Sequence, residues 1–104
     1  MIEGLAARLA ELAALNQTTT YGQLARDLSL QGPATIARLT TALEVLMAED
    51  AAAGRPFRAA LLSARGSTLP AQGFFDKAAA LGLTIQDQAL FVAEQRHALH
   101  FIFS

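Results

Sequence analysis

The chain contains no cysteine, which excludes a disulfide framework, a thiol nucleophile and any cysteine-ligated zinc or iron–sulfur site. It is also poor in charge: only 16% of its 104 residues are charged, whereas 53% are hydrophobic. A surface with so few charges leaves apolar area for a partner to cover. Eight basic and nine acidic residues give a net charge of −1, which argues against a strongly basic, stand-alone nucleic-acid binder.

The sequence also lacks a long hydrophobic run. No stretch of about 18 residues is apolar and uncharged throughout, so we expect no membrane-spanning helix. Glu3 and Glu11 interrupt the N-terminal apolar pattern, unlike the core of a secretory signal. We therefore expect a cytoplasmic protein. A chain of 104 residues can bury one hydrophobic core but not two, so a single domain over residues 1–104 is expected.

The region from Thr18 to Gly54 carries signals for two helices and a turn. Thr20-Tyr21-Gly22-Gln23 has capping-box spacing, in which a threonine hydroxyl accepts from the amide three residues on and a glutamine side chain reaches back. Gly32-Pro33 predicts the start of a long helix, with the glycine as N-cap, that ends near Ala53. Together they predict a short helix, a tight turn and a long helix, as in helix-turn-helix proteins. The expected buried stripe of the long helix is Ile36, Leu39, Leu43, Leu46 and Met47.

Helical and extended patterns flank this region on both sides. Apolar spacing predicts an amphipathic helix over residues 2–15, and three β-branched threonines predict a short extended segment after it. Downstream we expect a strand over 57–63, a short helix over 73–81 and, after a cap at Thr84, a final helix. The predicted fold is α+β and mostly helical: a winged-helix-like helix-turn-helix with a small β element and a C-terminal helix.

Two stretches resemble known proteins. The motif T-T-Y-G-x-L-A, followed by a proline-started helix with Ala37-Arg38, resembles the winged-helix DNA-binding domain of alkylguanine-DNA alkyltransferases and alkyltransferase-like proteins. The resemblance covers roughly residues 12–46 and implies that Arg38 enters the DNA while Tyr21 contacts its backbone. The family's Pro-Cys-His-Arg motif and its Trp variant are missing, which excludes alkyl transfer. The stretch GRPFRAALLSARGSTLPAQGFF resembles a block in small uncharacterised bacterial proteins without an established activity.

The leading hypothesis is a non-catalytic module that binds double-stranded DNA through a helix-turn-helix over residues 20–53. The long helix presents polar residues opposite its apolar stripe, where base edges or phosphates are met. Arginines of the expected strand and of a wing-like loop add phosphate contacts. The expected DNA-contacting residues are Tyr21, Thr35, Arg38, Thr41, Arg58 and Arg65. The alternative is a solvated helix face, and Glu44, Glu49 and Asp50 further along the helix repel phosphate.

The C-terminal segment is apolar on more than one side, which is unusual at a chain end. Such a patch packs back onto the first helix or lies in a two-fold homodimer interface. The residues expected in that interface are Phe91, Leu99, Phe101, Ile102 and Phe103. The alternative function is therefore a protein–protein interaction or dimerisation domain that does not bind nucleic acid.

No constellation able to do chemistry is found. Ser63 and Ser67 lack a base–acid arrangement and a nucleophile elbow. Glu94, His97 and His100 recur at steps of three residues, which drift around a helix, and no other segment supplies matching ligands. We expect no catalytic residue, no metal site and no cofactor.

Overall fold

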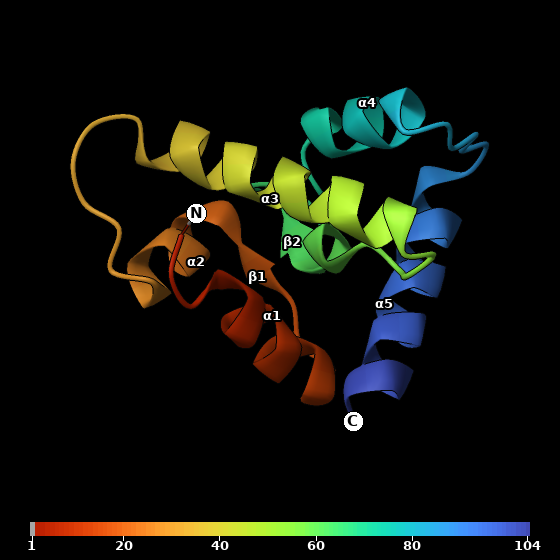
Figure 1. The fold of residues 1–104 in the computed structure, drawn as a ribbon, viewed down its shortest axis with the longest axis horizontal. Helices are drawn as coiled ribbons and strands as arrows, with labels where there is room; N and C mark the ends of the chain where they lie inside the picture. The colour runs from red at the N-terminus through yellow and green to blue at the C-terminus, as the bar shows by residue number, and fades with distance from the viewer. Residues whose placement is uncertain (1) are drawn as a thin grey trace.

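Five α-helices, one 3₁₀ helix and two very short strands make up residues 2–104, the part of the chain that the computed structural model describes (Figure 1). The helices are α1 (Leu5–Ala14), α2 (Tyr21–Asp27), α3 (Thr35–Ala52), α4 (Gln72–Ala80) and α5 (Gln88–Phe103). The 3₁₀ helix η1 (Arg58–Leu61) follows α3, and the strands are β1 (Thr19–Thr20) and β2 (Leu62–Ser63). The expected mostly helical fold with a small β element is thus confirmed.

The two strands join segments that lie far apart in the sequence. Thr19 pairs with Leu62 and Thr20 with Ser63, in parallel, and the crossover between them contains α2, α3 and η1. The strand expected over 57–63 is therefore only partly right, since its first part is the 3₁₀ helix. The cause lies outside the segment: Asp50 of α3 accepts a hydrogen bond from the Arg58 amide at 3.0 Å, which turns the chain at this point.

The core lies between α1, α3, η1 and α5. In Figure 1, α3 crosses the molecule above the sheet, and α5 descends beside η1 toward the end of α1. The helix α1 packs against α5, and both α3 and α5 pack against η1. The small side chains of Ala59 and Ala60 are buried in η1 and allow this close approach. The largest fully buried apolar side chains are Leu5, Leu9, Leu24, Leu39, Met47, Leu62, Val92 and Leu99.

The long helix α3 begins later than expected. Its N-cap is Ala34, which has φ 57° in the left-handed region and makes no side-chain cap. Gly32 has φ +90°, which is not the extended conformation of an N-cap, and the Thr35 hydroxyl donates to its carbonyl at 2.8 Å. The connector therefore covers residues 28–34, longer than the three- or four-residue turn of a standard helix-turn-helix. The Gly32 N-cap and the tight turn were wrong predictions.

The C-terminal end of α3 agrees with the sequence. Gly54 has φ +68°, and its amide donates to the Ala51 carbonyl at 3.2 Å, while the Arg55 amide donates to the Asp50 carbonyl at 2.8 Å. This pair of bonds is the Schellman motif that a glycine after the last turn favours. Four of the five stripe residues are buried, but Ile36 is 47% exposed because it lies on a flank of the helix.

The other helix starts agree in part. The Thr20 hydroxyl accepts from the Gln23 amide at 3.1 Å as expected, but the Gln23 side chain donates to Asp27 at 2.7 Å instead of reaching back. The short helix expected over 73–81 is α4, which spans Gln72–Ala80. The predicted cap at Thr84 is wrong, since the Asp87 carboxylate accepts from the Leu90 amide at 3.0 Å and starts α5 three residues later.

Candidate nucleic-acid interface

Three of the eight basic residues form ion pairs within the described part of the chain. Arg8 pairs with Asp27 at 3.3 Å, whereas Arg55 and Arg58 pair with Asp50 at 3.2 and 2.9 Å. Arg96 of α5 forms no ion pair but donates to three backbone carbonyls. The remaining basic side chains form no ion pair within residues 2–104: they are Arg26, Arg38, Arg65 and Lys77.

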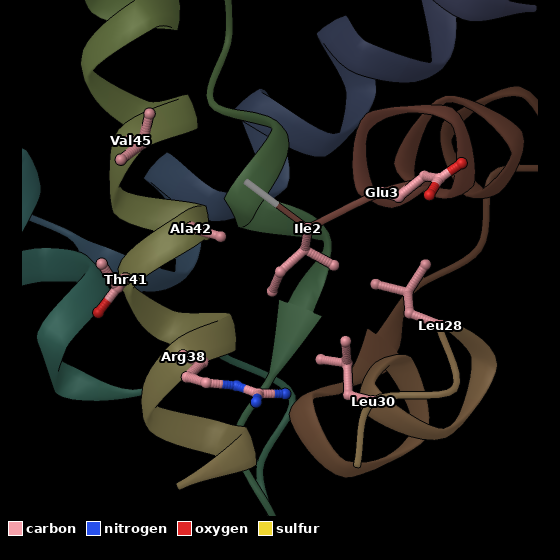
Figure 2. A pocket seen from close by; sticks show the side chains of 8 residues that line it. All are labelled: Ile2, Glu3, Leu28, Leu30, Arg38, Thr41, Ala42 and Val45. Atoms are coloured by element: carbon pink, nitrogen blue, oxygen red, sulfur yellow. The ribbon is translucent and has the colours of Figure 1, made fainter. Parts of the chain in front are cut away.

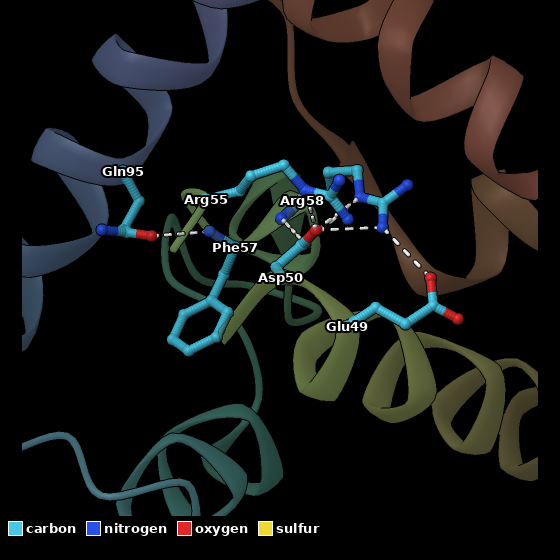
Figure 3. Close-up of polar contacts among 6 residues, drawn as sticks. All are labelled: Glu49, Asp50, Arg55, Phe57, Arg58 and Gln95. Carbon is cyan, nitrogen blue, oxygen red and sulfur yellow. Dashed lines mark hydrogen bonds and ion pairs between the residues drawn. The ribbon is translucent and has the colours of Figure 1, made fainter. Parts of the chain in front are cut away.

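Arg58 forms an ion pair with a buried carboxylate (Figure 3). The Asp50 side chain is 0% exposed and accepts from the Arg58 amide and Nε, each at 3.0 Å, and from the Arg55 Nε at 3.2 Å. The Arg58 side chain is only 15% exposed, and its Nη2 also lies 3.6 Å from Glu49. This placement argues against the phosphate contact expected at Arg58, because its charge is already neutralised inside the fold.

Arg96 of α5 holds the segment around β2 in place. Its guanidinium donates to the carbonyls of Ala60 at 2.7 Å, Thr68 at 2.9 Å and Leu62 at 3.2 Å. Burial lowers its pKa from the ordinary value. No local sequence pattern distinguishes this residue from other surface arginines. Its role depends on carbonyl groups that lie between 28 and 36 positions away.

Tyr21 ties the start of α2 to the segment before α4. Its hydroxyl oxygen accepts from the Ala71 amide at 3.2 Å, and the ring is partly buried. Burial raises the pKa of this phenol above its ordinary value of 10.0, outweighing the lowering effect of the Ala71 hydrogen bond. The hydroxyl therefore stays protonated at neutral pH, and its hydrogen remains available as a donor.

A groove lies on one flank of α3, between that helix and the connector to α2 (Figure 2). We call it the Arg38 groove; its volume is about 750 Å³, and Ile2, Leu28, Leu30 and Val45 line it with Arg38. Arg38 extends across the groove, and its Nη2 donates to the Gln31 carbonyl at 3.1 Å. Thr41 and Glu3 complete the polar part of the wall.

A second groove lies on the other flank of α3. Ile36 is one of its wall residues. Side chains two positions apart in an α-helix point about 200° away from each other, so Ile36 and Arg38 lie on opposite sides of α3. We call it the Arg26–Arg65 groove; it has a volume of about 770 Å³ and lies between α2, α3 and residues 64–66. Tyr21 lines it as well. Arg26 was not among the expected contacts, although its outward position on the short helix could have indicated it.

The two threonines expected to contact DNA have their hydroxyl hydrogens engaged. Thr35 donates to the Gly32 carbonyl at 2.8 Å, and Thr41 donates to the Ala37 carbonyl at 3.0 Å. Each can still accept a hydrogen bond from a ligand. Of the expected residues, Arg38 and Thr41 share one groove, and Tyr21 and Arg65 share the other.

The expected C-terminal interface divides into buried and exposed residues. Leu99 is 1% exposed, and the Phe91 ring packs 6.3 Å from Phe57 and 6.4 Å from Phe74, so both serve the core. The exposed fractions of Phe101, Ile102 and Phe103 are 80%, 54% and 38%. The three exposed residues are the last three of α5.

The C-terminal end of the neighbouring helix α1 also carries an exposed apolar residue. The His100 Nδ1 is 2.8 Å from the Ala13 carbonyl, so the C-terminal ends of α1 and α5 are adjacent, as Figure 1 also shows. Leu15 follows α1 and is 63% exposed. We call Leu15, Phe101, Ile102 and Phe103 the end patch.

Residues 2–104 contain no group of three or more His, Asp or Glu side chains placed to hold a metal ion. None of the helices in this part of the chain combines the length and apolar character needed to cross a bilayer. Comparisons of the chain with protein-family models, with curated proteins and with solved structures found no match.

Proposed function

We propose that this chain is a non-catalytic binding module that contacts double-stranded DNA through α2 and the first turns of α3. The observation that supports the proposal is the position of the unpaired arginines. Arg38 lies on one flank of α3, whereas Arg26 and Arg65 lie on the other. Residues 35–43 of the helix contain no acid, so a duplex approaching this part of the helix meets positive charge on both sides.

The proposed contacts follow from this arrangement. An α-helix fits the major groove of B-form DNA, where an arginine reaches guanine edges and the groove walls present phosphates. We assign base or phosphate contact to Arg38, and phosphate contact to Arg26 and Arg65. Three such contacts predict a slope of about −3 for the logarithm of the binding constant against that of the salt concentration. Binding is therefore weak at physiological salt.

Fluorescence anisotropy of a labelled short duplex tests the proposal. Arg38→Gln, Arg26→Gln and Arg65→Gln should each weaken binding at low salt and reduce the steepness of the salt dependence by about one unit. Lys77→Gln is the matched control, because Lys77 also lacks an ion pair but lies on α4. Absence of binding at low salt contradicts the proposal, as does an equal loss of affinity in the control.

A second candidate function, self-association, is favoured by the end patch. Four apolar side chains are exposed at adjacent helix ends, where a two-fold copy can cover part of them. Phe101→Ser should convert a dimer into a monomer by light scattering without changing helix content, since Phe101 is 80% exposed. Leu83→Ser is the control, since Leu83 is 37% exposed outside the patch. A wild-type chain that stays monomeric at high concentration contradicts this candidate.

A further inference from the structure

The walls of the Arg26–Arg65 groove carry positive charge without any acid. Arg26 comes from α2 and Arg65 from the segment after β2, so two separate parts of the chain place arginines on the walls of one groove. Three other hollows on the described surface each include an acid in the wall: Glu3, Glu44 or Asp50. An anion is therefore favoured in the Arg26–Arg65 groove over these hollows.

The donors in the groove suit a phosphate group. Arg26 donates to the Gln23 side chain through Nη2 at 3.0 Å, which leaves its other donors available, and Arg65 forms no ion pair within residues 2–104. A guanidinium presents paired donors that match two phosphate oxygens. Tyr21 adds an O–H group, because its oxygen accepts from Ala71 while its hydrogen is directed to no acceptor recorded in the described chain.

The rest of the groove is apolar and of ligand size. Ile36, Ala64, Ala71 and the Tyr21 ring form walls against which a flat ring can pack. The volume of about 770 Å³ falls within the range of about 300–1,000 Å³ that is typical of small-molecule sites. The groove thus combines two arginines, which suit an anion, with apolar side chains, which suit an organic group.

We propose that the Arg26–Arg65 groove binds a small phosphate monoester whose organic part is a flat ring. The phosphate lies between the two guanidiniums and the Tyr21 hydroxyl, and the ring packs against Ile36. This inference goes beyond the proposed DNA binding, since it uses one flank of α3 and does not need Arg38. The two can therefore fail independently.

Titration of the ¹⁵N-labelled full chain with phenyl phosphate, followed by amide chemical shifts, tests the inference. We expect shifts concentrated at Gly22, Ala64 and Gly66, and an affinity about tenfold higher than for inorganic phosphate or phenol, because each of these lacks one half of the ligand. Arg26→Gln and Arg65→Gln should each weaken binding about tenfold. Both side chains are exposed, so the fold is retained.

Arg38→Gln is the control that separates the two proposals, because it should reduce DNA binding and leave phenyl phosphate binding unchanged. Equal weakening by Arg38→Gln overturns the inference, since it indicates a general charge effect. Shifts confined to other residues, or inorganic phosphate binding as tightly as phenyl phosphate, also overturn it. Retained phenyl phosphate binding in a chain that binds no DNA supports this site alone.

Discussion

Asp50→Asn is the most informative single change for the stability of this fold. The Asp50 carboxylate is 0% exposed and is within 3.2 Å of donors from Arg55 and Arg58. Asparagine keeps the shape but removes the charge, so the guanidinium of Arg58, itself only 15% exposed, loses its neutralising partner. Breaking a buried ion pair in this way costs about 3–5 kcal/mol, a large part of the roughly 5–15 kcal/mol by which a domain is stable.

Urea unfolding followed by far-ultraviolet circular dichroism measures the effect. Glu49→Gln is the matched control, because Glu49 also pairs with Arg58 but at 3.6 Å and with a side chain 49% exposed. The control removes the same charge and should lower the free energy of unfolding by less than about 1 kcal/mol. If Asp50→Asn costs no more than Glu49→Gln, the buried carboxylate does not organise this part of the fold and the reasoning is refuted.

A double variant separates the ion pair from the packing. Asp50→Leu leaves the Arg58 guanidinium buried without a partner, whereas Asp50→Leu with Arg58→Met removes both charges. The double variant should be more stable than the Asp50→Leu single variant by about 1–3 kcal/mol. It should not recover fully, because the Arg58 amide has lost its acceptor. A double variant as unstable as the single one contradicts the role given to the buried charge.

Three further changes test other parts of the structure. Ala34→Gly should raise the free energy of unfolding by about 0.5 kcal/mol, because glycine adopts a φ of 57° without strain; a loss in urea unfolding contradicts this. Arg96→Gln should lower it by about 2 kcal/mol in the same assay, since three carbonyls lose their charged donor; a loss as small as that of Lys77→Gln contradicts this. Burial raises the pKa of Tyr21, so its contribution to stability is present below pH 10.0 and is lost as the pH rises further. Tyr21→Phe should lack this part of the alkaline loss, and tyrosinate absorbance reports this group alone because the chain has one tyrosine.

Features that depend on neighbouring residues could be predicted from the sequence. The stop of α3 needs only a glycine at φ +68°, and the start of α2 needs only a hydroxyl three residues before an amide. The start of α3 could not be predicted in this way, because a left-handed alanine has no sequence signal. At α5, Thr84 and Asp87 are both acceptable caps, and packing decides between them.

The candidate site shows the same division. From the sequence, Arg38 and Arg58 are both expected to be exposed arginines. In the structure, however, Arg58 forms an ion pair with an aspartate eight positions earlier. That aspartate continues the buried side of α3, so its burial could have been noticed as a charge in an apolar stripe. The grooves depend on long-range pairing, which local patterns do not contain. Arg26 and Arg65 are 39 positions apart in the sequence and share one groove only in the folded chain.

The parallel pairing of β1 with β2 sets the order in which the molecule can assemble. Closing a loop from Thr20 to Ser63 is slow compared with forming α2 or α3, because the two residues are far apart in the sequence whereas helical contacts are local. Residues 64–66 follow directly after this contact, so the Arg26–Arg65 groove is complete only when the two strands have paired. A ligand in this groove binds only the folded state and therefore makes local opening of the strands rarer. Amide hydrogen exchange near β1 and β2 should then slow as the groove fills with ligand.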